Sequence, residues 1–154
     1  MIEALIIILS ILMDQGSKWL AVKSLKPVGS IPIIQDVFHL SYHENTGAAF
    51  SILREHTEIL GIISVIASIL LIIYLLHMKK TESNRLAEIA LAMIIGGAIG
   101  NGIDRFLHGY VVDFFDFRII NFAIFNVADS FITVGVILFA IGVLFEDKKK
   151  RAQH

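Results

Sequence analysis

The sequence predicts a mainly helical membrane protein with four transmembrane helices, a small extracytoplasmic β-sheet and a short interfacial segment. Apolar residues make up 56% of the 154 residues, and the mean hydropathy is +0.76. This is more apolar surface than a soluble domain of this size needs for its core. Four apolar stretches approach the roughly 20 residues that a helix needs to cross a bilayer. Lysine and arginine residues also concentrate in two short segments, as they do in the short cytoplasmic loops of membrane proteins.

The four spans are expected at about 2–22, 59–76, 86–104 and 124–145 of a single integral membrane domain, 1–154. The second has no charged residue, and the fourth carries only Asp129. The first is interrupted by Asp14 and Lys18. Its start carries Glu3 rather than a basic cluster, and no small-residue cleavage site follows, so we expect a retained span rather than a cleaved signal peptide. An interfacial helix is the alternative.

Orientation follows from the lysines and arginines. The short link 77–85 and the tail after Phe145 together hold seven basic residues, whereas the longer connections 23–58 and 104–121 hold five. Short basic segments stay on the cytoplasmic side. Both termini are therefore expected inside, and both long connections outside.

The outer connections contain β-strand patterns. Phe38, Leu40 and Tyr42 alternate with polar residues, which predicts a strand. Residues 45–47 are typical of a turn, and 48–53 are expected to return as a second strand. The aromatic run 111–117 is too short to span and is expected to lie in the interface. The remaining outer acids, Asp116 among them, are expected to be solvated or interfacial.

Polar residues from several parts of the chain converge on one membrane level. With a rise of roughly 1.5 Å per residue, Asp129 and Asp104 lie roughly 24 and 27 Å above the inner ends of their helices. Both thus reach the outer edge of a hydrocarbon core about 30 Å thick. Asn45 and Asp113 belong to the outer connections, so they join this level. Asp14 lies just past the midplane.

Helical spacing groups some of these residues on common faces. Asn126 and Asp129 are three positions apart, and so are Asn101 and Asp104. Arg105 follows on the second of these faces. Carboxylates in hydrocarbon are costly and are usually paired or functional.

Several groups have a structural interpretation beside the functional one. Asp14 and Lys18 are an i,i+4 pair, which serves equally well as an ion pair that lets the span tolerate both charges. The adjacency of Asp104 and Arg105 also favours a structural role, in which Arg105 orients neighbouring carboxylates or a peptide carbonyl. By contrast, Asp113 and Asp129 have no basic residue within four positions.

A glycine motif in the third span indicates packing rather than catalysis. Gly96 and Gly100 form G-x-x-x-G, which is more often a close helix contact than part of an active site.

Several kinds of chemistry are excluded by composition. The chain has no cysteine, His43-Glu44 lacks the second histidine of H-E-x-x-H, and G-x-S-x-G is absent. No basic, aromatic-laced patch indicates nucleic acid. Carboxylate chemistry remains: two close carboxylates share a proton, so one activates water while the other polarises a carbonyl. The residues alone do not decide whether Asp104 or Asp113 is the partner of Asp129.

Two other classes of function compete with this interpretation. A small ion- or proton-coupled transporter would use Asp14, Asp104 and Asp129 as ion sites, but it predicts carboxylates distributed through the membrane depth. A membrane assembly factor without enzymatic activity would use the polar residues for packing.

Five blocks of sequence resemble lipoprotein signal peptidases, the signal peptidase II family of bacterial membrane aspartic proteases. They are Asp14-Gln15 with Lys18, Asn45 to Phe50, Gly96 to Arg105, Val111 to Phe114, and Phe125 to Ser130. They occur in the family's order over nearly the whole chain.

The resemblance implies removal of the signal peptide from a prolipoprotein, just before a cysteine that carries a diacylglyceryl group. It implies that Asp113 and Asp129 form the catalytic dyad and that no metal or cofactor takes part. It places these residues in site support or substrate contact: Asp14, Lys18, Asn45, Gly47, Asn101, Asp104, Arg105 and Asn126. It further implies inhibition by globomycin-type cyclic peptides, membrane lipid as surroundings, and an active site near the outer face of the bacterial cytoplasmic (inner) membrane. The outer sheet and the segment 106–118 are expected to clamp the substrate.

Overall fold

Four long helices form the body of the protein. The computed structural model describes residues 1–47, 57–81, 84–120 and 122–151. The helices are α1 (Ile2–Ser24), α2 (Thr57–Thr81), α3 (Arg85–His108) and α4 (Val127–Arg151). Each contains a segment that is long and apolar enough to cross a membrane, so the four predicted spans are confirmed. Each helix extends past its predicted C-terminal end, and α4 begins at Val127 rather than near residue 124.

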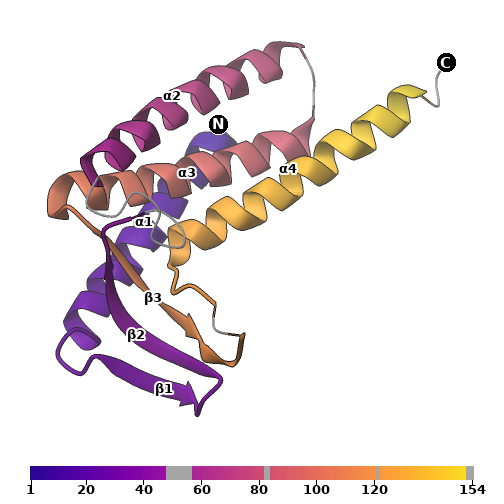
Figure 1. Ribbon diagram of the computed structural model, residues 1–154. Coiled ribbons are helices and arrows are strands. Elements are labelled where there is room, and N and C mark those ends of the chain that lie inside the picture. Colours follow the sequence, from indigo (N-terminus) through magenta and orange to yellow (C-terminus); the bar gives the residue numbers. More distant parts are fainter. Residues whose placement is uncertain (48–56, 82–83, 121, 152–154) are drawn as a thin grey trace.

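Helix α3 lies among the other three helices and is the most buried of them (Figure 1). Glycines allow its close contacts. A Cβ on Gly96 would lie 2.5 Å from Cβ of Ser10 in α1, and one on Gly100 would collide with the Asp14 carboxylate. The predicted G-x-x-x-G contact is therefore a contact between α3 and α1. On another face, a Cβ on Gly97 would lie 2.5 Å from the Ala128 carbonyl oxygen of α4.

The outward faces of α1, α2 and α4 carry the large exposed apolar side chains, for example Leu12, Leu70 and Ile137. Such a continuous apolar surface needs a bilayer to cover it. Helices α1, α2 and α4 thus present apolar side chains to the lipid.

A three-stranded antiparallel sheet lies at one end of the helices (Figure 1). Its strands are β1 (Ser30–Ile34), β2 (Phe38–Asn45) and β3 (Val111–Phe117), in that order across the sheet. The alternating pattern from Phe38 therefore predicted β2 correctly. The run 111–117, expected as an interfacial piece, is the third strand because pairing with β2 satisfies its backbone N–H and C=O groups. The predicted return strand 48–53 lies outside the described residues.

One sheet residue is more buried than expected. Asp116, expected to be solvated or interfacial, is not solvated, because it is only 8% exposed. Its carboxylate accepts hydrogen bonds from Ser41 Oγ at 2.8 Å and from Arg118 Nε at 2.9 Å. Ser41 lies across the sheet in β2, and the cross-strand neighbour could not be read from local sequence.

The start of α1, the C-terminal ends of α2 and α4 and the start of α3 lie at the end away from the sheet (Figure 1). Glu3 is 3% exposed there. Its carboxylate accepts from Lys79 Nζ and from Arg85 Nη1, both at 2.7 Å, and from the N-terminal ammonium at 3.1 Å. These bonds tie the start of α1 to the basic link. We call Glu3, Lys79 and Arg85 the link cluster.

Candidate active site

The sheet is fixed to the helices through β3. The Val112 N–H donates to the Asp104 carboxylate of α3 at 3.1 Å. The N–H groups of Phe114 and Phe115 donate to the carbonyl oxygen of Phe125, just before α4. These bonds place Asp113, between them on β3, beside the first turn of α4.

The first turn of α4 positions Asp129. Asn126 precedes the helix, and its side-chain oxygen accepts from the Asp129 N–H at 3.0 Å. In return, the Asp129 carboxylate accepts from the Asn126 N–H at 3.2 Å. This reciprocal pair is a capping box, which satisfies backbone N–H groups that the helix leaves free. The i,i+3 spacing noted in the sequence is thus the spacing of a cap.

Side-chain amides hold both candidate catalytic carboxylates. Asp113 is 1% exposed; it accepts from Asn126 Nδ2 at 2.7 Å and from Asn45 Nδ2 at 2.8 Å. Asp129 accepts from Asn101 Nδ2 at 2.8 Å as well as from the Asn126 backbone. Each of the four carboxylate oxygens therefore faces a neutral N–H donor. Asn126 donates to both carboxylates and bridges them.

Burial of Asp113 changes its acidity. Burial first, and then the nearby Asp129 carboxylate, raise the pKa of Asp113 to about 7, against the lowering effect of its hydrogen bonds from Asn45 and Asn126. Near neutral pH this carboxyl therefore exchanges a proton readily. A neighbouring pair of carboxylates that holds one proton is the arrangement needed to activate water.

A second layer of charge lies behind the amides. Lys18 Nζ contacts Asp14 Oδ2 at 2.8 Å and Asp104 Oδ2 at 3.1 Å, and all three side chains are almost completely buried. The predicted Asp14–Lys18 pair is confirmed. Asp104 has the structural role suggested for it, but its cation is Lys18 of α1 rather than the adjacent Arg105. The Ala128 N–H of α4 donates to Asp14 at 3.0 Å, which connects α1 to α4.

One member of this layer was missed by the site prediction. Gln15 Nε2 lies 3.1 Å from Asp14 Oδ2, 3.0 Å from Asp104 Oδ1 and 3.1 Å from the Gly100 carbonyl oxygen. A polar side chain inside a predicted span, next to an aspartate, was the signal that could have identified it.

The remaining predicted residues close the network. Arg105 donates to the Asn101 carbonyl oxygen at 3.3 Å and to that of Gly47 at 3.5 Å. The Gly47 N–H donates to Asn45 Oδ1 at 2.9 Å, which orients the Asn45 amide towards Asp113. Arg105 Nε is buried without a partner among the described residues. All ten predicted site residues thus belong to one connected network.

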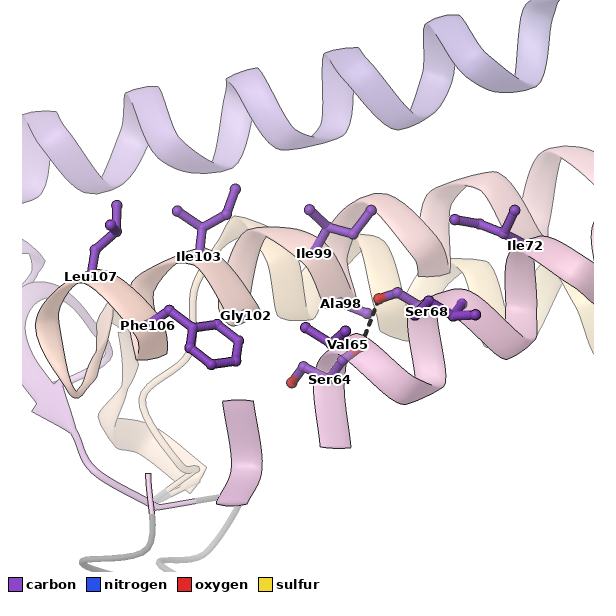
Figure 2. A pocket seen from close by; sticks show the side chains of 11 residues that line it. Ser64, Val65, Ser68, Ile72, Ala98, Ile99, Gly102, Ile103, Phe106 and Leu107 are labelled. Carbon is purple, nitrogen blue, oxygen red and sulfur yellow. Dashed lines mark hydrogen bonds between the residues drawn. The ribbon is translucent and has the colours of Figure 1, made fainter. Parts of the chain in front are cut away.

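A groove runs along another face of α3. Its volume is about 550 Å³, and it lies between α2 and α3 (Figure 2). Figure 2 shows Ile99, Ile103 and Phe106 of α3 pointing into the same space as α2 side chains. The Ser64 and Ser68 hydroxyls donate to carbonyl oxygens of their own helix, which leaves the lining apolar. Ala98 and Gly102, three positions before and one position after Asn101 in the sequence, also line the groove.

Known proteins match this chain over nearly its whole length. A family model described as signal peptidase (SPase) II matches residues 6–145. The lipoprotein signal peptidase of Caldanaerobacter subterraneus subsp. tengcongensis is 49% identical over 136 residues, which cover 88% of this chain and 91% of the relative. That of Clostridioides difficile is 46% identical over 98% of this chain and its own full length.

A solved structure is also similar. It is described as a bacterial membrane enzyme determined by the in meso method at 2.3 Å resolution. It superposes with a TM-score of 0.82 at 35% identity and covers 96% of this chain and 90% of its own.

Proposed function

The chain belongs to the signal peptidase II family, and we propose that it removes the signal peptide from diacylglyceryl-modified prolipoproteins with Asp113 and Asp129 as its catalytic dyad. One observation carries the proposal. The two carboxylates come from β3 and α4, share Asn126 as a donor, and bind no cation directly within the described residues. The cut falls just before the lipidated cysteine.

The dyad acts with one proton between its two members. Ionised Asp129 takes a proton from a water molecule, whose oxygen attacks the scissile carbonyl carbon. Protonated Asp113 donates a hydrogen bond to the carbonyl oxygen and stabilises the charge that develops on it. The C–N bond then breaks as the proton held by Asp129 moves to the departing amino group of the cysteine. The products are a free carboxyl end of the signal peptide and a free amine on the lipidated cysteine.

The surroundings suit a lipid-modified substrate. The apolar groove between α2 and α3 lies on the helix that also supplies Asn101, and its hydrocarbon lining matches an acyl chain. The basic residues of the link and tail support cytoplasmic termini. With both termini in the cytoplasm, the sheet and the dyad face the outer side of the membrane. A substrate that enters sideways from the bilayer reaches the dyad without leaving the lipid.

The test uses purified protein in detergent and a diacylglyceryl-modified prolipoprotein. We expect cleavage by the unaltered protein, with or without EDTA, and almost none by Asp113→Asn or Asp129→Asn. Asp36→Asn is the matched control: Asp36 lies in the exposed turn between β1 and β2 at φ 58°, a conformation that asparagine tolerates. This control should cleave normally. Cleavage by a folded Asp129→Asn protein would overturn the dyad.

A further inference from the structure

The hydrogen bond from Asn101 to Asp129 depends on which way the Asn101 amide points. An asparagine amide presents an oxygen acceptor on one side and an NH₂ donor on the other, and a half-turn exchanges them. Asn101 must present its NH₂ to Asp129 Oδ1, at 2.8 Å, for that carboxylate to be held. Something on the opposite side of the amide has to hold its oxygen.

Lys18 holds that oxygen. Its Nζ lies 2.9 Å from Asn101 Oδ1, and the lysine is 3% exposed. An ammonium has three N–H donors and no acceptor. Lys18 has three acceptors within reach, Asp14, Asp104 and Asn101, one for each proton. Its third proton therefore requires that Asn101 turn its oxygen inward.

The opposite orientation of Asn101 would be disfavoured on every side. Its NH₂ would then face the Lys18 ammonium and also Asn126 Nδ2, which now donates to Asn101 Oδ1 at 3.1 Å. Its oxygen would face the Asp129 carboxylate. Three attractive contacts would become repulsive at once.

We propose that Lys18 is a positioning residue for the reaction, which fixes the Asn101 amide so that Asp129 always receives its N–H. Among the described residues, Lys18 itself makes no hydrogen bond or ion pair with either carboxylate of the dyad. Its effect reaches Asp129 through one amide. The inference rests on the proposed dyad and adds a buried charge on α1 to the groups that the reaction needs.

A purely structural role makes a different prediction. If Lys18 only neutralises Asp14 and Asp104, removing one negative charge with it should restore the protein. Lys18→Met combined with Asp104→Asn keeps the charge of this group at −1, and asparagine still offers an oxygen to the Val112 N–H. This charge-balanced variant separates the two roles.

The experiment compares Lys18→Met, the charge-balanced variant and the unaltered protein by melting temperature, kcat and KM. We expect the charge-balanced variant to recover the melting temperature lost by Lys18→Met. We expect its kcat to stay about 10- to 100-fold low, the range seen when a residue that orients a reacting group is removed, with KM unchanged. Recovery of kcat together with the melting temperature would overturn the proposal.

A double-mutant cycle gives a second, independent measurement. In an Asn101→Ala background the amide is already absent, so the charge-balanced substitutions should lower kcat by less than about threefold. Multiplicative losses would contradict the proposal. Failure of both Lys18 variants to fold would also contradict it, because Lys18 would then act on folding rather than on turnover. Normal cleavage by Asp113→Asn or Asp129→Asn would instead refute the dyad itself.

Discussion

Both ends of the helical body bury carboxylates, but their partners differ. At the end away from the sheet, Glu3 binds Lys79 and Arg85 in the link cluster. At the sheet end, Asp113 and Asp129 bind neutral amides. A nearby cation favours the charged form of a carboxylate, whereas an amide orients it with much less constraint on its charge. The cation-bound group therefore stabilises the fold, and the amide-bound Asp113 remains able to exchange a proton.

The second layer of charge brings a cation close to the amide-bound carboxylates. Lys18 is a cation close to the dyad, yet its charge is taken up by Asp14 and Asp104 rather than by Asp129. Among the described residues, the Asn101 amide connects the two layers, because it accepts from Lys18 and donates to Asp129. The cation is thus kept one residue away from the reacting carboxylate.

Removing the shared amide should have the largest effect. Asn126→Ala takes one donor from Asp113 and the cap from α4. Loss of a donor to a group that changes charge in the reaction typically lowers kcat by about 10² to 10³-fold. We expect a loss of this size, measured as kcat on the lipidated prolipoprotein.

The matched control is the asparagine that caps α3 near the other end. Asn84 accepts from the Ala87 N–H at 3.0 Å and donates to the Gly142 carbonyl oxygen at 3.0 Å. Asn84→Ala should cost about 1 kcal/mol of stability and leave kcat unchanged. Equal losses of kcat in the two variants would remove the distinction between the ends.

A smaller effect is expected in the pH dependence of kcat/KM. In the proposed mechanism, Asp113 must be protonated to polarise the carbonyl. Its pKa is about 7, so kcat/KM should fall as the pH rises through about 7. The Asn45 hydrogen bond lowers this pKa by favouring the ionised form. Asn45→Ala should therefore move the alkaline limb to higher pH, measured between pH 5 and 9.

Ser41→Ala serves as the control for this shift. Ser41 donates to the Asp116 carboxylate of the same sheet, which Arg118 also binds. Its removal should leave the alkaline limb in place. If the alkaline limb of the Asn45→Ala variant stays unchanged or moves to lower pH, the pKa of Asp113 does not determine that limb.

The smallest effect on turnover is expected in the link cluster. Glu3→Gln removes the ion pairs to Lys79 and Arg85, whose side chains are partly exposed. We expect a loss of about 1 kcal/mol in stability, seen as a lower melting temperature, with kcat unchanged within about twofold. A fall in kcat at unchanged melting temperature would mean that this carboxylate also serves the reaction.

The sequence predicted the features that depend on residues close together in the chain. Apolar length fixed the four spans, and alternation from Phe38 predicted β2. The i,i+4 spacing of Asp14 and Lys18 predicted an ion pair because helical neighbours meet on one face. Depth along the spans brought the polar residues to one level, since rise per residue is constant in a helix.

Contacts between distant segments could not be predicted in this way. Asp104 lies next to Arg105 in the chain, but the rotation of α3 against α1 turns it towards Lys18. The run 111–117 looks interfacial by composition, and only its partner β2 makes it a strand. The choice of Asp113 over Asp104 as partner of Asp129 came from family resemblance, because residues alone cannot show which carboxylate a remote strand delivers.

The two halves of the dyad are carried by separate bodies, Asp113 by a strand outside the helices and Asp129 by a helix. They are brought together only when the Val112 N–H reaches Asp104 and Phe114 reaches Phe125. Under the proposed dyad, hydrolysis requires both bodies to be in place. Activity would then report whether the sheet is seated on the helices, and not only whether the helices have formed.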